Sequence, residues 1–117
     1  MKKIKIILKK QNVQTNKIYE EIVEYNEDIT ILDLSFKSLI EIPLGLEQFK
    51  NLEILYLHDN QISKIQFLTA DAKPFNKNHL IHLKTLWLNN NQITKIENLN
   101  KLVNLQTLDL KDNQITK

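Results

Sequence analysis

The sequence predicts an α/β fold, a solenoid in which short parallel strands line a concave face and the return segments lie on the far side. The first observation is the pattern L-x-x-L-x-L-x-x-N-x-I, which occurs three times and is preceded by a weaker copy. The second is its spacing, because the copies follow one another at intervals of 23, 31 and 22 residues. Periods of this length are typical of repeat proteins. We therefore expect four repeats over residues 29–117. The intervals are measured at Leu32, Leu55, Leu86 and Leu108.

Each copy is expected to form a short strand at L-x-L. Its two Leu side chains face the core and the residue between them faces out, because side chains alternate along a strand. One unit cannot bury its own apolar side chains, so neighbouring units must stack on a shared core. The recurring Asn lies where the chain turns inward, and its amide can satisfy backbone groups buried by that turn. We expect a structural ladder of Asn60, Asn91 and Asn113, with Lys37 at this position in the first copy.

These copies resemble the leucine-rich-repeat family. The tail I-x-x-I-x-x-L-x-x-L is similar to the short 22-residue intracellular class. That class includes regulatory subunits of protein phosphatase type 1, spliceosomal A-prime-type proteins and dynein light-chain relatives. The resemblance implies a right-handed solenoid with a scaffold or regulatory role, but a fold shared this widely does not identify a partner. The tail consists of Ile93, Ile96, Leu99 and Leu102.

The interval of 31 residues identifies an insertion. Leu99 and Leu102 are three residues apart, whereas their equivalents, Leu68 and Leu80, are twelve apart. The extra residues lie within about 69–78, where Pro and the only two Ala of the chain favour a loop. We expect this loop to leave the return side of the solenoid.

Residues 1–28 are expected to cover the N-terminal end of the core, since a solenoid otherwise exposes its core there. In the first part, Ile4, Ile6 and Leu8 alternate with Lys residues, which favours a strand.

A helix is expected in the second part of this segment. Thr15 or Asn16 can cap a helix that runs to about Asn26. Its apolar side would pack on the first repeat and its acids would face solvent. The apolar side consists of Ile18, Ile22 and Tyr25, with Tyr19 and Val23 beside them.

The charges are segregated along the N-terminal segment. Residues 1–17 carry six Lys and no acid, and residues 18–36 carry six acids and no base. We interpret the Lys residues as guards of an edge strand, since Lys blunts pairing between strand edges. The alternative is a basic arm that binds RNA or anionic lipid. On the favoured interpretation, nucleic acid is not the expected partner.

Nothing positive in the composition indicates catalysis. The chain has no Cys nucleophile, and Gly45 is its only Gly, which excludes Gly-rich phosphate-binding loops. His79 and His82 are a weak metal signal without further ligands. We therefore expect neither an enzyme nor a cofactor or metal. The lack of Cys and of a signal-peptide or membrane-spanning stretch predicts a cytoplasmic protein.

No segment follows the last repeat turn to cover the C-terminal end of the core. Three explanations compete. The sequence is a piece of a longer repeat protein, the open end self-associates with another chain, or the last layer frays. The first two are favoured, because an uncapped repeat end is prone to association.

The outward positions of the strands are the strongest candidates for binding, since solenoids bind extended partners on their concave surface. Trp87 and Tyr56 occupy the same position in adjacent units, so their rings should touch. Exposed Trp and Tyr are common interface hot spots, although the alternative is a cross-strand pair that stabilises the sheet. The candidate partner-binding residues are Trp87, Tyr56, His58, Asp59, Asp33, Phe36, Asn89, Asp109 and Lys111.

The sequence therefore predicts a protein–protein interaction module that binds a partner protein through its concave face. One alternative is a repeat segment of a larger signalling protein, such as a kinase, a GTPase or a ubiquitin ligase. The other is nucleic-acid or membrane-surface binding through the Lys-rich N-terminus.

Overall fold

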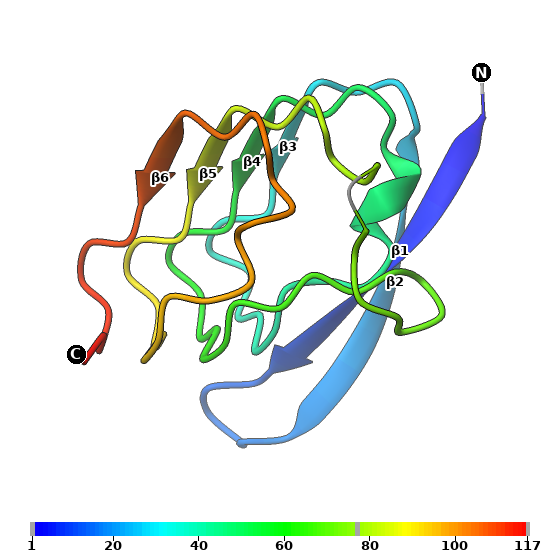
Figure 1. Cartoon of the computed structure of the whole chain (residues 1–117). Coiled ribbons are helices and arrows are strands. Elements are labelled where there is room, and N and C mark those ends of the chain that lie inside the picture. Colours follow the sequence, from blue (N-terminus) through cyan, green and yellow to red (C-terminus); the bar gives the residue numbers. More distant parts are fainter. Residues whose placement is uncertain (1, 77, 117) are drawn as a thin grey trace.

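The chain folds into two β-sheets. The computed structural model describes residues 2–76 and 78–116, and these residues contain no α-helix. A hairpin of β1 (Lys3–Gln11) and β2 (Ile18–Asn26) precedes a sheet of four parallel strands. Figure 1 shows these four strands side by side in chain order, with the hairpin beyond β3. They are β3 (Ile31–Asp33), β4 (Ile54–Tyr56), β5 (Thr85–Trp87) and β6 (Thr107–Asp109), and a 3-10 turn, η1 (Leu46–Gln48), lies between β3 and β4.

The repeats determine the register of the four-stranded sheet. The second Leu of each unit aligns with the second Leu of its neighbours, so that equivalent residues form rows across the strands. The parallel strands that the repeats predict are confirmed. The core lies behind this sheet and includes Leu32, Leu34, Leu55, Leu57, Leu86, Leu88, Ile62 and Ile93, all of them buried.

The helical part of the predicted α/β fold is wrong for the described residues, because the return segments are not helical. In the second unit, Ile62 and Ile65 are three residues apart and both are fully buried. A period of three matches an extended helix of the polyproline II kind or a 3-10 turn, whereas an α-helix needs a period of 3.6. The segment between them has no helical or strand hydrogen bonding.

The predicted N-terminal helix is also wrong, since residues 18–26 form strand β2. β2 pairs with β1 in antiparallel register, with Val23 opposite Ile6 and Tyr25 opposite Ile4. β-branched and aromatic residues favour strands where a partner strand is present. Helical spacing of the apolar residues was misleading, because Ile22 is exposed on the outer face while Val23 packs against the core.

The residues that suggested a helix cap build the hairpin turn instead. The Asn12 side chain accepts hydrogen bonds from the backbone N–H groups of Gln14 and Thr15. Asn16 has a left-handed backbone, with φ of 61°, and its N–H donates to the Asn12 carbonyl. Asn tolerates this conformation and bonds locally to the backbone, which is why it serves turns as well as caps.

The hairpin explains the segregated charges. Lys5 lies opposite Glu24 and Lys9 opposite Glu20, and Lys10 Nζ lies 3.3 Å from Glu21 Oε1. Opposite charges on facing strands favour their pairing. β1 is paired on both edges, with β2 and with the first repeat, so the interpretation of its Lys residues as guards of an edge strand is wrong. The free edge of this sheet is β2, which is acidic.

β1 joins the hairpin to the first repeat through its other edge. The N–H of Gln11 donates to the Ser38 carbonyl, and the N–H of Ile40 donates to the Lys9 carbonyl, both at 3.0 Å. The inward side chains of β1 are buried against the first unit, and Gln48 Nε2 donates to the Lys5 carbonyl. These inward side chains are Ile4, Ile6 and Leu8.

The segment predicted as an insertion includes residue 77, which lies outside the described residues. Its first part forms a tight loop, in which the N–H of Thr69 donates to the Lys73 carbonyl and Leu68 bridges to Pro74. Phe75 then turns back and is buried, with its ring 5.5 Å from that of Phe67. The inserted segment therefore adds to the core.

The fourth unit is less covered than the others. Leu108 is 37% exposed, whereas its equivalents in the three preceding units are buried. Ile115 and Val103 are exposed on the same unit.

Among the described residues, no helix could span a membrane.

Candidate functional site

The candidate site is the outward side of the four-stranded sheet, here called the sheet face. It comprises the outward residues of β3–β6 and, in each unit, the two residues that follow the second Leu of L-x-L. The register places Asp33, Tyr56, Trp87 and Asp109 in one row across the four strands. The structure thus places Tyr56 and Trp87 on adjacent strands, as their equivalent positions predict, with Asp33 and Asp109 at the two ends of this central row.

Four rings gather on the sheet face. The Tyr56 and Trp87 ring centroids are 4.7 Å apart, and His58 lies 5.9 Å from Tyr56 and 5.6 Å from Trp87. Phe36 extends this group on the first unit, with its ring 5.6 Å from that of His58 and nearly perpendicular to it. Trp87 is 36% exposed and Phe36 is 74% exposed. This aromatic group spans three units and carries apolar surface that the core does not use.

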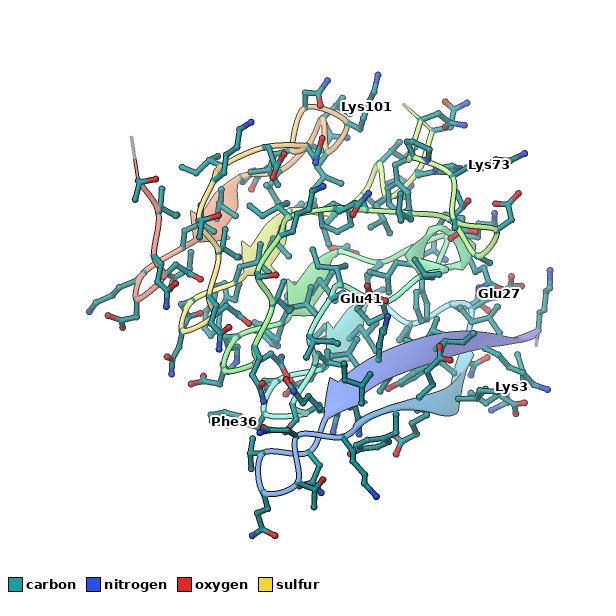
Figure 2. All side chains as sticks on the ribbon, turned by 90° about the horizontal axis from the view of Figure 1, so that it is seen from below. Lys3, Glu27, Phe36, Glu41, Lys73 and Lys101 are labelled. Carbon is teal, nitrogen blue, oxygen red and sulfur yellow. The ribbon has the colours of Figure 1, made fainter. Side chains whose placement is uncertain are left out.

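Phe36 has an unfavourable backbone conformation. Its φ is 55°, in the left-handed region, and the equivalent residues of the other units have the same conformation. Those residues are Asp59, Asn90 and Asp112. Asn and Asp tolerate left-handed φ, but for a bulky residue it costs about 1–2 kcal/mol. Figure 2 shows Phe36 near the hairpin turn, at the opposite end of the hairpin from Lys3 and Glu27.

His58 and Asp59 form the polar centre of the sheet face. His58 Nδ1 lies 2.6 Å from Asp59 Oδ2, and the Asn90 side chain donates a hydrogen bond to the other carboxylate oxygen. The hydrogen bond from His58 lowers the pKa of the Asp59 carboxyl, and that from Asn90 lowers it further. Asp59 is therefore a carboxylate held in a fixed position.

Two further acids, both on the central row, have carboxylates that are fixed by hydrogen bonds from the turn after their strand. The Asp33 carboxylate accepts hydrogen bonds from the hydroxyl and the backbone N–H of Ser35, and these bonds lower its pKa. Asp109 accepts a hydrogen bond from the backbone N–H of Lys111 at 3.0 Å. The Lys111 side chain is on the exposed surface of the fourth unit. The sheet face thus has an acidic residue at each end of its central row.

Asn89, also a candidate, lies partly buried. Its carbonyl accepts a hydrogen bond from the N–H of Asp59, which ties the second unit to the third. Its side-chain oxygen is buried and accepts no hydrogen bond from the described residues. A buried acceptor without a donor is unfavourable.

The three Asn residues of the repeat link neighbouring units below the sheet face. Each donates from Nδ2 to a carbonyl of its own unit and to one of the preceding unit, such as Leu88 and Leu57 for Asn91. Each also accepts from a backbone N–H of the preceding unit, such as that of Ile62 for Asn91. Asn60 and Asn113 make the corresponding bonds. They hold the strands that position the aromatic group.

His79, which the sequence singled out, packs its ring 4.9 Å from Phe75 and accepts a hydrogen bond from the N–H of Asn76. Over residues 2–76 and 78–116, no three His, Cys, Asp or Glu side chains gather in a group that could hold a metal ion.

Two features were missed from the sequence. One is a cavity of about 180 Å³ on the return side, lined by Phe67, Phe75 and Leu102 among others. The length of the insertion was the signal for it, but the burial of Phe75 was not anticipated. The other is the free edge of β2, which the predicted helix concealed.

Comparisons with known proteins agree with the repeat pattern. A family model described as Leucine Rich repeats (2 copies) matches residues 81–117, and one described as Leucine Rich Repeat matches residues 51–69. The chain is similar to leucine-rich repeat-containing protein 51 of Homo sapiens and of Pan troglodytes, with 38% identity over 50 residues. The matched segment covers 43% of this chain and 26% of those relatives, so it spans about a quarter of their length.

Proposed function

The chain belongs to the leucine-rich-repeat family, and we propose that it binds a partner protein through its sheet face. Leucine-rich repeats generally mediate protein–protein interaction. Phe36, Tyr56 and Trp87 are the proposed apolar anchors, with His58 between them. The role proposed with this binding is that of a scaffold or a regulator.

The observation that carries the proposal is Phe36. It occupies a left-handed position that the other three units fill with Asp or Asn, and the residue is 74% exposed. The fold gains little from such a residue, because a strained and exposed Phe neither relaxes the backbone nor fills the core. Strained residues cluster at binding sites, where the strained conformation serves the contact. A partner that covers this ring would gain the burial that the fold leaves unused.

Charge supports a basic partner. Asp33, Asp59 and Asp109 lie on the sheet face, and Asp112 follows β6 at its edge. An Arg or Lys side chain of the partner would meet these carboxylates and lie over the Trp87 or Tyr56 ring, where the electron-rich face of the ring attracts a cation. We therefore propose an extended, Arg- or Lys-containing segment as the occupant of the sheet face.

The substitution Phe36→Asn tests the proposal, because its effects on stability and on binding should have opposite signs. Asn is the residue of the third unit at this position and tolerates left-handed φ, so we expect the free energy of unfolding to rise by about 1 kcal/mol. Binding should weaken, since the anchor is lost. Urea unfolding measures the first effect. Affinity capture from a lysate of the source cell, quantified by mass spectrometry, measures the second.

The matched control is Ile96→Asn, which makes a similar apolar-to-polar change at an exposed residue on the return side. We expect Phe36→Asn and Trp87→Ala to lose the same captured protein and Ile96→Asn to retain it. Equal capture by all four chains, wild type included, would place binding away from the sheet face and contradict the proposal.

A further inference from the structure

The free edge of β2 has unpaired backbone groups, and the hydrogen bonds at the two ends of the hairpin identify them. The N–H of Asn12 donates to the Lys17 carbonyl, and the N–H of Glu27 donates to the Lys2 carbonyl. Hydrogen-bonded pairs alternate along an antiparallel ladder. The odd-numbered residues of β2 therefore bond to β1, and its even-numbered residues direct their N–H and C=O groups away from the hairpin.

The other edge of β1 supports this assignment. Gln11 and Lys9, both odd-numbered, use their backbone groups to bond to Ser38 and Ile40 of the first repeat. Only the even-numbered residues of β1 remain for β2. The outward groups of β2 thus belong to Ile18, Glu20, Ile22 and Glu24, and no backbone bond to these groups occurs within the described ranges.

The same stretch exposes apolar surface. Ile18 is 56% exposed and Ile22 is 66% exposed, and Ile7 lies beside Ile22 on the outer face of the hairpin. A long edge strand with exposed apolar side chains is a ready template for another strand. Proteins bind extended segments in this way, with backbone hydrogen bonds supplying affinity and side chains supplying specificity.

Charge identifies the kind of strand that fits. β2 carries Glu20, Glu21 and Glu24 and no base, and the strand that it already binds, β1, is rich in Lys. The Glu21 side chain is still 50% exposed after pairing with Lys10, and Glu20 and Glu24 are exposed as well. The acids therefore remain available to a second basic strand on the free edge.

A second copy of this chain fits poorly. Two β2 strands that paired edge to edge in full antiparallel overlap would be centred on Ile22 and would place Glu20 of each copy opposite Glu24 of the other. Like charges directly opposite each other destabilise a strand pair. The acids thus discourage self-pairing while matching a basic segment.

We propose that the free edge of β2 binds an extended segment of a partner protein in which Lys or Arg alternates with β-branched residues, adding it as a third strand beyond β2. The proposal concerns a surface other than the sheet face and does not depend on it.

A labelled peptide with the sequence of β1, KIKIILKKQ, serves as the probe, and its affinity for the whole chain is measured by fluorescence anisotropy. The control peptide replaces each Lys by Glu. The chain variants are Ile22→Pro and Ile22→Ala. Pro removes the outward N–H of residue 22 and leaves the bonds to β1 intact, whereas Ala retains that N–H.

We expect the basic peptide to bind the wild type and Ile22→Ala, and the acidic peptide not to bind. Ile22→Pro should weaken binding at least about tenfold, because the added strand loses its hydrogen bond to the N–H of residue 22. The difference between Ile22→Pro and Ile22→Ala should persist when both chains also carry Trp87→Ala, which removes an anchor that a Lys-containing segment could use on the sheet face. Equal affinity of Ile22→Pro and Ile22→Ala, with or without Trp87→Ala, or no binding to the wild type would each overturn the proposal.

Hydrogen exchange of the wild type gives a result that does not depend on whether Ile22→Pro folds. Bound peptide should slow exchange at the amides of Ile18, Glu20, Ile22 and Glu24. A peptide that displaced β1 would instead release the Ile40 amide, which donates to Lys9. Faster exchange at Ile40, or no protection along β2, would contradict strand addition.

Discussion

The repeats and the N-terminal hairpin are both built from paired strands, but different features of the sequence determine the pairing. In the repeats, a Leu that recurs at intervals of 23, 31 and 22 residues aligns each strand with the next, and strands of only three residues suffice. The hairpin has no repeat, and its nine-residue strands pair through opposite charges and an Asn-based turn. A repeat is recognised when copies of one pattern are compared along the sequence. The complementarity of two unlike strands becomes visible only when both strands are considered together.

The largest expected effect separates the two faces of the hairpin. Ile6 is buried on the inner face of β1, so Ile6→Ala should lower the free energy of unfolding by about 2–5 kcal/mol. Ile22 is exposed on the outer face of β2, so Ile22→Ala should change it by no more than about 0.5 kcal/mol. Urea unfolding measures both. A loss of similar size for Ile22→Ala would mean that residues 18–26 bury the face expected of a helix.

The next effect concerns the links between repeats. Asn91 is buried, with 7% exposure, and its side chain bonds to a buried backbone N–H and to a buried carbonyl, which its removal would leave without this partner. Asn91→Ala should therefore cost about 1–3 kcal/mol. Asn113 makes the corresponding bonds in the more exposed fourth unit, where water can replace its amide, so Asn113→Ala should cost less. Thermal or urea unfolding of the two variants tests this order, and equal losses would contradict it.

The smallest effect is the acid sensitivity of the sheet face. Hydrogen bonds lower the pKa of Asp59 in the folded chain below its ordinary value of 3.8. A lowered folded pKa contributes stability that is present above the unfolded pKa and is lost as the pH falls through the folded pKa. As the pH drops below about 4, the melting temperature should therefore fall, and it should fall less steeply in Asp59→Asn than in the wild type. Melting curves between neutral pH and pH 3 test this. Parallel pH profiles of the two chains would show that Asp59 contributes nothing.

The predictable part of the fold is the part governed by local spacing. Leu55 and Leu86 gave the strands and their register, and through them the rows of the sheet face. Asn60, Asn91 and Asn113 were expected at inward turns because an amide has both donors and acceptors to offer there.

The parts that could not be predicted depend on contacts between distant segments. Ile18, Ile22 and Tyr25 suit a helix by spacing, and only the presence of β1 makes the strand the better choice. The burial of Phe75 depends on Phe67, which lies on the far side of the inserted loop. The conformation of Phe36 was also hidden, because the equivalent Asp and Asn residues fit several kinds of turn.

The direction of the Asn bonds has a consequence for synthesis. The inward turn of each of the first three units is completed by an amide of the following unit: Leu39 by Asn60, Ile62 by Asn91, and Ile93 by Asn113. These partners are 21, 29 and 20 residues apart. A unit that leaves the ribosome therefore cannot close its turn until its successor has followed. Vectorial synthesis should build this stack one unit behind the growing chain.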